Sequence, residues 1–236
     1  MKALFIQHDH VSPSGPLGDR LRHHGFEVSE VLVVPEESFG SPNVTFDFPD
    51  FNDYDVIVPM GAPWGAWDSD CIGNWLEPEV EWVRGAVEAG KAVLGVCFGG
   101  QLMARGLGGS VAPAPQCEIG WKDVWSDRPE ILGNGPWFQF HYDRWVVPTN
   151  AVEIARNPIA SQAFIYGNSM AIQFHPEVTG DSLVGWLDWG GDKKVIEDGQ
   201  DPELMKAQTR AYETASVERT NALVDGFLRH VAKLID

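Results

Sequence analysis

The chain has 236 residues, and 44% of them are hydrophobic, which is enough apolar surface to bury a substantial core. Its 34 acidic residues outnumber its 17 basic residues, so the net charge is −17 at pH 7. Such a chain repels phosphate backbones and anionic lipid. We therefore expect neither a nucleic-acid partner nor a membrane partner.

The cysteines and the N-terminus predict the compartment. Three cysteines, Cys71, Cys97 and Cys117, are too few and too irregularly spaced for a disulfide framework or a zinc site. The first eight residues lack the apolar stretch of a signal peptide, and no apolar run is long enough to span a membrane. His8 and His10 form an H-x-H pair, but a third ligand is missing. We expect a cytoplasmic protein with reduced thiols and with neither a metal nor another cofactor.

Short apolar runs alternate with amphipathic stretches in the first half of the chain. Strands are predicted over residues 3–7, 26–34, 55–58 and 92–96. Helices are predicted over residues 17–24, 72–87 and 99–105. Strands that alternate with helices indicate an α/β fold, with a doubly wound, mostly parallel sheet and helices on both of its faces.

The pattern changes beyond residue 109. Short strands separated by turns are predicted over residues 120–125, 144–147, 152–155, 163–166 and 169–174, and they indicate an antiparallel extension of the sheet. Residues 189–200 are polar and contain glycine, and we expect a loop there. Asp201 and Pro202 supply the cap and first residue of a final helix. Because no repeat or linker is visible, we expect one domain over residues 1–236.

The predicted strand at 92–96 runs directly into a glycine-flanked cysteine. Residues 95–99 read Gly-Val-Cys-Phe-Gly, the cysteine form of the strand–turn–helix elbow that hydrolases use. Such a turn lifts Cys97 out of the sheet and sets it at a helix N-terminus, where the helix dipole favours a thiolate. The backbone N–H of Phe98 then points to where an oxyanion would form.

A second motif follows the predicted strand at 169–174. The chain continues there as His175-Pro176-Glu177. A cysteine nucleophile needs a proton acceptor that is itself oriented, and Glu177 is near enough to accept a hydrogen bond from the His175 imidazole. We expect the Cys97 sulfur to lie within hydrogen-bond reach of one ring nitrogen of His175, with Glu177 on the other nitrogen.

Together the two motifs, in the order Cys97, His175, Glu177, resemble the class I glutamine amidotransferases and in particular their stand-alone, GMP-synthase-like branch. The resemblance covers roughly residues 3–186. It implies that Cys97 attacks the side-chain amide carbon of glutamine and releases ammonia, and that water then cleaves the glutamyl thioester. His175 would shuttle the protons, and Glu177 would orient His175.

The resemblance also implies an oxyanion site and one substrate contact. The turn at residues 60–63 resembles the oxyanion loop of the family, so that a backbone N–H of Gly61 or Ala62 would act together with that of Phe98. The family often has a second glycine where this chain has Ala62, which leaves the identity of the donor open. Gln101 matches a position that contacts the amino-acid end of the substrate.

Two further segments, 118–121 and 140–143, resemble parts of the family that lie close to the substrate. On this basis Glu118 is expected to bind the substrate ammonium. The backbone of His141 and Tyr142 is expected to line the substrate pocket.

The sequence leaves the substrate open between free glutamine and a γ-glutamyl peptide or amide. No P-loop pattern occurs, so we do not expect this chain to activate an acceptor. Ammonia would then pass to a separate synthetase or acceptor subunit, or a γ-glutamyl compound would be hydrolysed for its own sake. Two other classes remain: a catalytically silent binding or regulatory subunit, which the complete Cys97, His175 and Glu177 set disfavours, and a different cysteine hydrolase on a similar fold, which the H-P-E motif disfavours.

Overall fold

The computed structural model describes residues 1–236, and its nine strands form one sheet in the order β2-β1-β3-β4-β9-β8-β7-β5-β6. The parallel strands are β1 (Lys2–Gln7), β2 (Glu27–Leu32), β3 (Val56–Pro59), β4 (Ala92–Val96) and β9 (Ser169–Ile172). The antiparallel strands are β5 (Ser110–Ser126), β6 (Gly135–Val146), β7 (Val152–Arg156) and β8 (Ser161–Tyr166). This mixed sheet confirms the predicted fold class.

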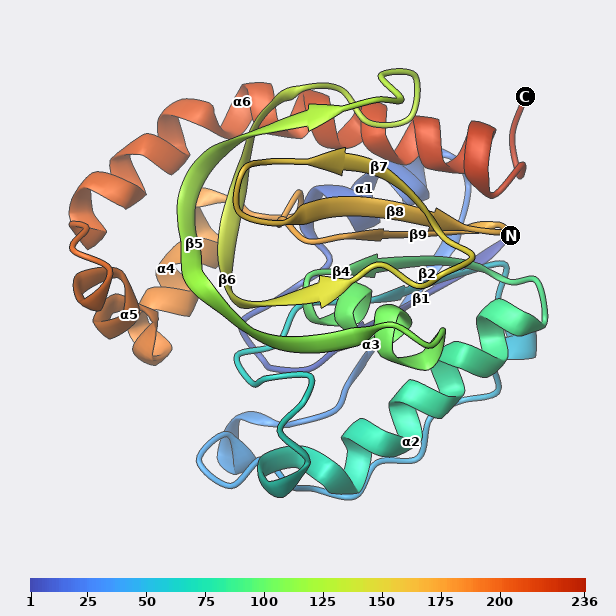
Figure 1. Ribbon diagram of the computed structural model, residues 1–236, viewed down its shortest axis with the longest axis horizontal. Coiled ribbons are helices and arrows are strands. Elements are labelled where there is room, and N and C mark those ends of the chain that lie inside the picture. The colour runs from blue at the N-terminus through green and yellow to red at the C-terminus, as the bar shows by residue number, and fades with distance from the viewer.

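Helices cover both faces of the parallel half, as Figure 1 shows. One face carries α1 (Gly15–His23) and α6 (Pro202–Gly226), which η4 (Phe227–Val231) continues. The other face carries α2 (Ser69–Glu88) and α3 (Phe98–Gly106). Two short 3-10 helices, η1 (Glu36–Ser38) and η2 (Phe51–Asp53), interrupt the connection between β2 and β3.

The alternation of side chains along β1 explains these two layers. Phe5 packs in one core cluster with residues of α1 and α6, whereas Leu4 packs in a second cluster with residues of α2 and α3. Successive strand residues point to opposite faces, so a strand that is apolar at every position needs a cover on both sides. Since β1 is buried over residues 3–6, both helical layers are required.

Strands β5 and β6 are much longer than the sequence predicts, and they arch away from the rest of the sheet (Figure 1). Most of β5 is exposed or half-buried, and its pairing with β6 shifts register between Pro113 and Glu118. The full length of these strands was not predicted, because they contain prolines and many polar residues. Alternation of apolar and polar residues reveals only strands that have one buried face.

Residues 187–197 form helices, so the expectation of a loop over 189–200 was wrong for most of that segment. Helix α4 (Gly180–Trp186) continues into η3 (Leu187–Gly191) and α5 (Asp192–Glu197). The apolar anchors in this segment are Leu187 and Val195, which pack with Phe138 of β6 in a third core cluster. Two anchors among polar neighbours are too few to reveal a helix by periodicity.

The carboxyl ends of β3, β4 and β9 meet at one edge of the sheet. The Met60 N–H donates to the Ile6 carbonyl at 3.0 Å, and the Cys97 N–H donates to the Ile172 carbonyl at 2.7 Å. The His175 N–H reaches across to the carbonyl of Phe138 on β6 at 2.8 Å. Three chain segments that are far apart in the sequence are therefore fixed side by side, where α/β proteins hold their ligands.

The structure contains no helix with the length and apolar character needed to cross a membrane.

An ion pair joins α1 to α6. Arg20 lies 2.6 Å from the Asp225 carboxylate, and His24 lies 2.7 Å from it. The hydrogen bonds from Arg20, helped by those from His24, lower the pKa of Asp225 to about 2. Because this pKa is below that of an unfolded aspartate, the pair stabilises the fold above about pH 4, and that contribution is lost as the pH falls toward 2.

We expect Asp225→Asn to lower the free energy of unfolding at pH 7 by about 1–2 kcal/mol, because the charged acceptor for Arg20 and His24 is removed. The variant should also lose less stability than the unaltered chain between pH 5 and pH 2. Urea unfolding at several pH values measures both quantities. Asp47→Asn, at an exposed position without an ion pair, is the control. Equal acid sensitivity of Asp225→Asn and the unaltered chain would contradict the linkage.

Candidate active site

Cys97 sits in a strained turn between β4 and α3. Its φ of 49° and ψ of −104° lie outside the regions that residues with a Cβ prefer. A Cβ at Gly99 would lie 2.0 Å from the Pro59 carbonyl oxygen, and one at Gly95 would lie 2.6 Å from the Gly99 carbonyl oxygen. Both glycines are therefore required for the chain to pass through this turn, which exposes the sulfur at the start of a helix.

The Cys97 sulfur, although its residue is only 5% exposed, has a polar neighbour in addition to the helix terminus. The side-chain amide of Gln173 donates to the sulfur at 3.6 Å. Gln173 is fully buried, and its own oxygen accepts from the Gln101 amide at 3.4 Å. The Gln173 amide and the N-terminus of α3 therefore both place partial positive charge next to the sulfur.

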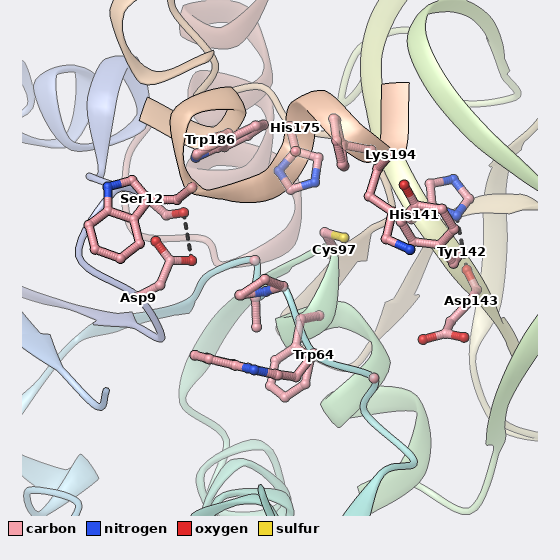
Figure 2. Close-up of a pocket in the computed structure, with 18 of the residues that line it drawn as sticks. Asp9, Ser12, Trp64, Cys97, His141, Tyr142, Asp143, His175, Trp186 and Lys194 are labelled. Atoms are coloured by element: carbon pink, nitrogen blue, oxygen red, sulfur yellow. Dashed lines mark hydrogen bonds between the residues drawn. The ribbon is translucent and has the colours of Figure 1, made fainter. Parts of the chain in front are cut away.

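His175 lies beside Cys97 in the close-up of Figure 2. Its Nδ1 donates to the Glu177 carboxylate at 2.7 Å, while its buried Nε2 forms no hydrogen bond. Burial alone lowers the pKa of His175, but the Glu177 carboxylate and the Cys97 sulfur outweigh this effect and raise that pKa well above 6.5. The free Nε2 of His175 is available to a group in the cavity.

The turn at residues 60–63 passes directly against both groups. A Cβ at Gly61 would lie 2.8 Å from Cε1 of His175 and 3.9 Å from Cβ of Cys97, so only glycine fits this position. Phe98 is the first residue of α3, where the backbone N–H has no acceptor within the helix. Gly61, Ala62 and Phe98 all line the same cavity as the sulfur.

This cavity has a volume of about 490 Å³. Eight of the residues that the sequence singled out line it, namely Gly61, Ala62, Cys97, Phe98, Gln101, His141, Tyr142 and His175. Glu177 lies behind His175 and is 1% exposed.

Glu118 does not line the cavity, in contrast to the expected contact with a substrate ammonium. Its carboxylate lies behind His141, 3.2 Å from Nε2 of that ring. Gln162 and Asn157 donate to its two oxygens, and the residue is 1% exposed. Its position on β5 makes Glu118 a support for His141 in this structure, because both of its oxygens accept hydrogen bonds inside the protein.

The cavity has charged groups on two sides of Cys97, and of these only Asp143 lies in a segment that the sequence analysis placed near the substrate. Lys194 and Asp143 lie on the same side as Tyr142, and Asp9 lies on the other side with Trp186 (Figure 2). Burial raises the pKa of both Asp9 and Asp143. The Asp9 carboxylate also accepts from Ser12 at 2.9 Å, so it is held in place.

Two of the missed groups, Asp9 and Gln173, had a weak signal in the sequence. Asp9 follows a buried strand, at the edge where ligands bind in α/β proteins. Gln173 is a polar residue near the end of a mostly apolar predicted strand. Trp186 and Lys194 belong to the helical segment that follows β9, whose second part was expected to be a loop, and nothing local shows that it folds back over the cavity.

We expect Glu177→Gln to lower the pKa of His175, because a neutral amide stabilises the imidazolium less than a carboxylate does. In the unaltered chain the ring should be protonated at pH 7, and in the variant its neutral fraction should rise. Nitrogen NMR of the labelled histidine rings measures this directly. Glu27→Gln, at an exposed position on β2, should leave the His175 signals unchanged. A His175 ring that is mostly neutral at pH 7 in the unaltered chain would contradict the prediction.

Comparison with known proteins places the chain in a family. The family model described as "Glutamine amidotransferase class-I" matches residues 50–183. A glutamine-hydrolysing GMP synthase of Aeropyrum pernix is 33% identical over 130 residues, which cover 52% of this chain and 24% of that protein. The chain thus spans about a quarter of the length of such curated relatives.

Solved structures agree in fold. A glutamine amidotransferase from Thermotoga maritima superposes with a TM-score of 0.81 at 22% identity, covering 97% of this chain and 98% of the other. A glutamine amido transferase from Methylobacillus flagellatus gives a TM-score of 0.83 at 22% identity, covering 98% and 95%. Since the family model matches more than half of the sequence and the fold agrees along nearly all of it, the chain belongs to the class I glutamine amidotransferase family.

Proposed function

We propose that this chain hydrolyses the side-chain amide of glutamine through a thioester on Cys97, with His175 as acid and base and Glu177 as the residue that orients His175. The observation that carries the proposal is the meeting of three features in one cavity. These are the strained Cys97 turn, the His175–Glu177 pair with its hydrogen bond of 2.7 Å, and the turn at residues 60–63. Family membership supports the same reaction.

In the first half of the reaction, the Cys97 thiolate attacks the amide carbon and forms a carbon–sulfur bond. The carbonyl oxygen becomes an oxyanion, which the backbone N–H of Phe98 and a backbone N–H of Gly61 or Ala62 stabilise. The carbon–nitrogen bond then breaks as the His175 imidazolium gives its Nε2 proton to the leaving nitrogen. Ammonia leaves, and a glutamyl thioester and a neutral His175 remain.

In the second half, neutral His175 removes a proton from water, and the resulting hydroxide attacks the thioester carbon. The same donors stabilise the second oxyanion. The carbon–sulfur bond breaks, glutamate leaves, and the thiolate and the imidazolium are restored. Glu177 supports both halves because its carboxylate fixes Nδ1 as a donor and so keeps Nε2 directed at the reacting atoms.

The amino-acid end of the substrate carries one positive and one negative charge. The side of the cavity with Lys194 and Asp143 offers the complementary pair, and Gln101 also lines the cavity. We assign the substrate carboxylate to Lys194 and the substrate ammonium to Asp143. This assignment replaces the contact expected from Glu118, whose oxygens are occupied by Gln162 and Asn157.

A γ-glutamyl amide or peptide is the second candidate substrate, and the size of the cavity favours it. A volume of about 490 Å³ is in the range of pockets that hold drug-sized ligands, which are larger than glutamine. On the side of Cys97 away from Lys194, the leaving group would meet Asp9 and Trp186. A cationic or aromatic amine fits this side of the cavity.

We propose further that the ammonia serves a separate synthetase, because the matched relatives are glutamine-hydrolysing GMP synthases. The proposal includes a single folded domain over residues 1–236 and a cytoplasmic location. The free thiols of Cys71, Cys97 and Cys117 support a reducing compartment.

Cys97→Ser should lower the rate of amide hydrolysis by more than about 10³-fold, because a hydroxyl is a far poorer nucleophile than a thiolate. An electrophilic glutamine analogue should label Cys97 in the unaltered chain without any partner protein, as mass spectrometry of its peptides can show. Cys71→Ser and Cys117→Ser are the controls and should keep both activity and labelling. Labelling confined to Cys71 or Cys117, or more than a few per cent of activity in Cys97→Ser, would overturn the assignment.

Lys194→Met should raise the KM for glutamine about tenfold or more, with a smaller change in kcat, because the side chain binds a charge that does not react. Lys193→Met removes an exposed neighbour of the same charge outside the cavity, and its KM should not change. Ammonia or amine release from glutamine and from a panel of γ-glutamyl amines measures this effect and also identifies the preferred substrate. An unchanged KM in Lys194→Met would contradict the proposed orientation of the substrate.

A further inference from the structure

A buried histidine–glutamate pair lies behind the turn at residues 60–63 and has no part in the mechanism above. His8 follows β1 directly, Glu79 lies on α2, and both side chains are 0% exposed. Nε2 of His8 lies 3.0 and 3.1 Å from the two carboxylate oxygens of Glu79. Nδ1 of His8 lies 3.0 Å from the carbonyl oxygen of Gly61.

The chemistry of one partner identifies Nδ1 of His8 as a donor. A carbonyl oxygen can only accept, so Nδ1 carries the proton of the hydrogen bond to Gly61. Burial alone lowers the pKa of His8, but Glu79 and the Gly61 carbonyl outweigh it and raise that pKa. Buried ion pairs contribute little net stability compared with apolar side chains of similar size. The pair therefore needs an explanation other than stability.

The hydrogen bond to Gly61 fixes the orientation of one peptide group. The Gly61–Ala62 peptide is trans, so its C=O and its N–H point in opposite directions. The C=O points toward His8, which lies outside the cavity, so the Ala62 N–H points away from His8. On that side Gly61 and Ala62 line the cavity, and Gly61 lies against Cys97 and His175.

His8 also contacts the residue that supplies the second N–H group. The ring of Phe98 packs edge-on against His8 at a centroid distance of 4.8 Å, and Trp75 of α2 stacks on His8 at 5.5 Å. The imidazole is therefore locked between α2, α3 and the turn. A ring held on all sides can hold a peptide group in one orientation.

We propose that His8, held by Glu79, is a positioning residue that keeps the Gly61–Ala62 peptide turned so that the Ala62 N–H faces the oxyanion. Without His8 the peptide is free to rotate, and a rotated peptide presents the Gly61 carbonyl oxygen to a developing negative charge. The inference rests on the proposed function, since it assigns the oxyanion to the Cys97 reaction. It identifies Ala62, rather than Gly61, as the donor in this turn.

The test distinguishes a loss of oxyanion stabilisation from a loss of reactivity of the Cys97 nucleophile. Hydrolysis of an amide passes through a tetrahedral oxyanion, whereas alkylation of Cys97 by iodoacetamide does not. His8→Gln should lower kcat for amide hydrolysis by about 10- to 100-fold, a loss near that of one oxyanion donor, with KM and the alkylation rate within about twofold of the unaltered chain. Glu79→Gln keeps an acceptor for Nε2 of His8, and its loss of kcat should be smaller.

His24→Gln is the matched control, because it breaks another histidine–carboxylate pair, with Asp225, whose residues do not line the cavity. It should leave kcat and the alkylation rate unchanged. A His8→Gln variant with kcat within about twofold of the unaltered chain overturns the inference. A parallel fall of kcat and alkylation also overturns it, because general damage to the site would explain both. If His8→Gln does not fold, Glu79→Gln carries the same comparisons.

A crystal structure of His8→Gln or Glu79→Gln supplies a readout that needs no turnover. The inference expects the Gly61–Ala62 peptide to be rotated or present in two orientations, and a peptide unchanged in both variants overturns it. An unaltered chain that hydrolyses neither glutamine nor any γ-glutamyl amide would instead refute the proposed function. In that case the orientation of the peptide in the crystal still decides the role of His8.

Discussion

The backbone of Cys97 has a conformation that costs a residue with a Cβ about 1–3 kcal/mol, and the surrounding structure maintains it. Two hydrogen bonds hold the turn, one from the Cys97 N–H to Ile172 of β9 and one from the Gly99 N–H to Met60 after β3. Gly95 and Gly99 let the flanking chain approach closely enough to form them. The strained residue therefore determines the positions of three parts of the site: the sulfur, the N-terminus of α3 and the turn at residues 60–63.

Two buried histidine–glutamate pairs stand on opposite sides of the turn at residues 60–63. His175 and Glu177 face the cavity, and both come from the same short segment after β9. His8 and Glu79 lie behind the turn and are 71 residues apart in the sequence. The His175 ring occupies the space where a side chain at Gly61 would lie. The His8 ring forms a hydrogen bond with the Gly61 carbonyl oxygen. Because Gly61 has no side chain, the two histidine–glutamate pairs can approach each other until only one peptide unit lies between them.

The sequence predicted the parts of the structure that depend on local chemistry. The β4 strand, the glycine-flanked Cys97 and the H-P-E segment were all visible, because strand ends, helix caps and tight turns need particular residue types. The arching strands β5 and β6 were underestimated, since their side chains are mostly exposed or half-buried and show no clear alternation. Their length comes from pairing with each other, which no local pattern encodes.

The residues of the candidate site also fall into those that local sequence predicted and those that it did not. Residues in recognisable turns were found. Asp9 and Lys194 reach the cavity, and Gln173 reaches the Cys97 sulfur, only through the tertiary fold. Glu118 is the opposite case. The sequence analysis singled out its segment, but its side chain contacts His141, Gln162 and Asn157 instead of the cavity. A single sequence reports which residue types are present, but the partner of a buried carboxylate depends on segments distant in the chain.

The pairing of β4 with β9 has a consequence for the growing polypeptide on the ribosome. These strands are neighbours in the sheet, yet Val93 of β4 and Ser169 of β9 are 76 residues apart. At roughly 5–20 residues per second, β4 waits about 4–15 s after its own synthesis before its partner emerges. During that time an apolar strand has an open edge, which is the kind of surface that drives aggregation. The time for which β4 keeps an open edge is thus set by helix α3 and the antiparallel strands that the chain inserts between Cys97 and His175.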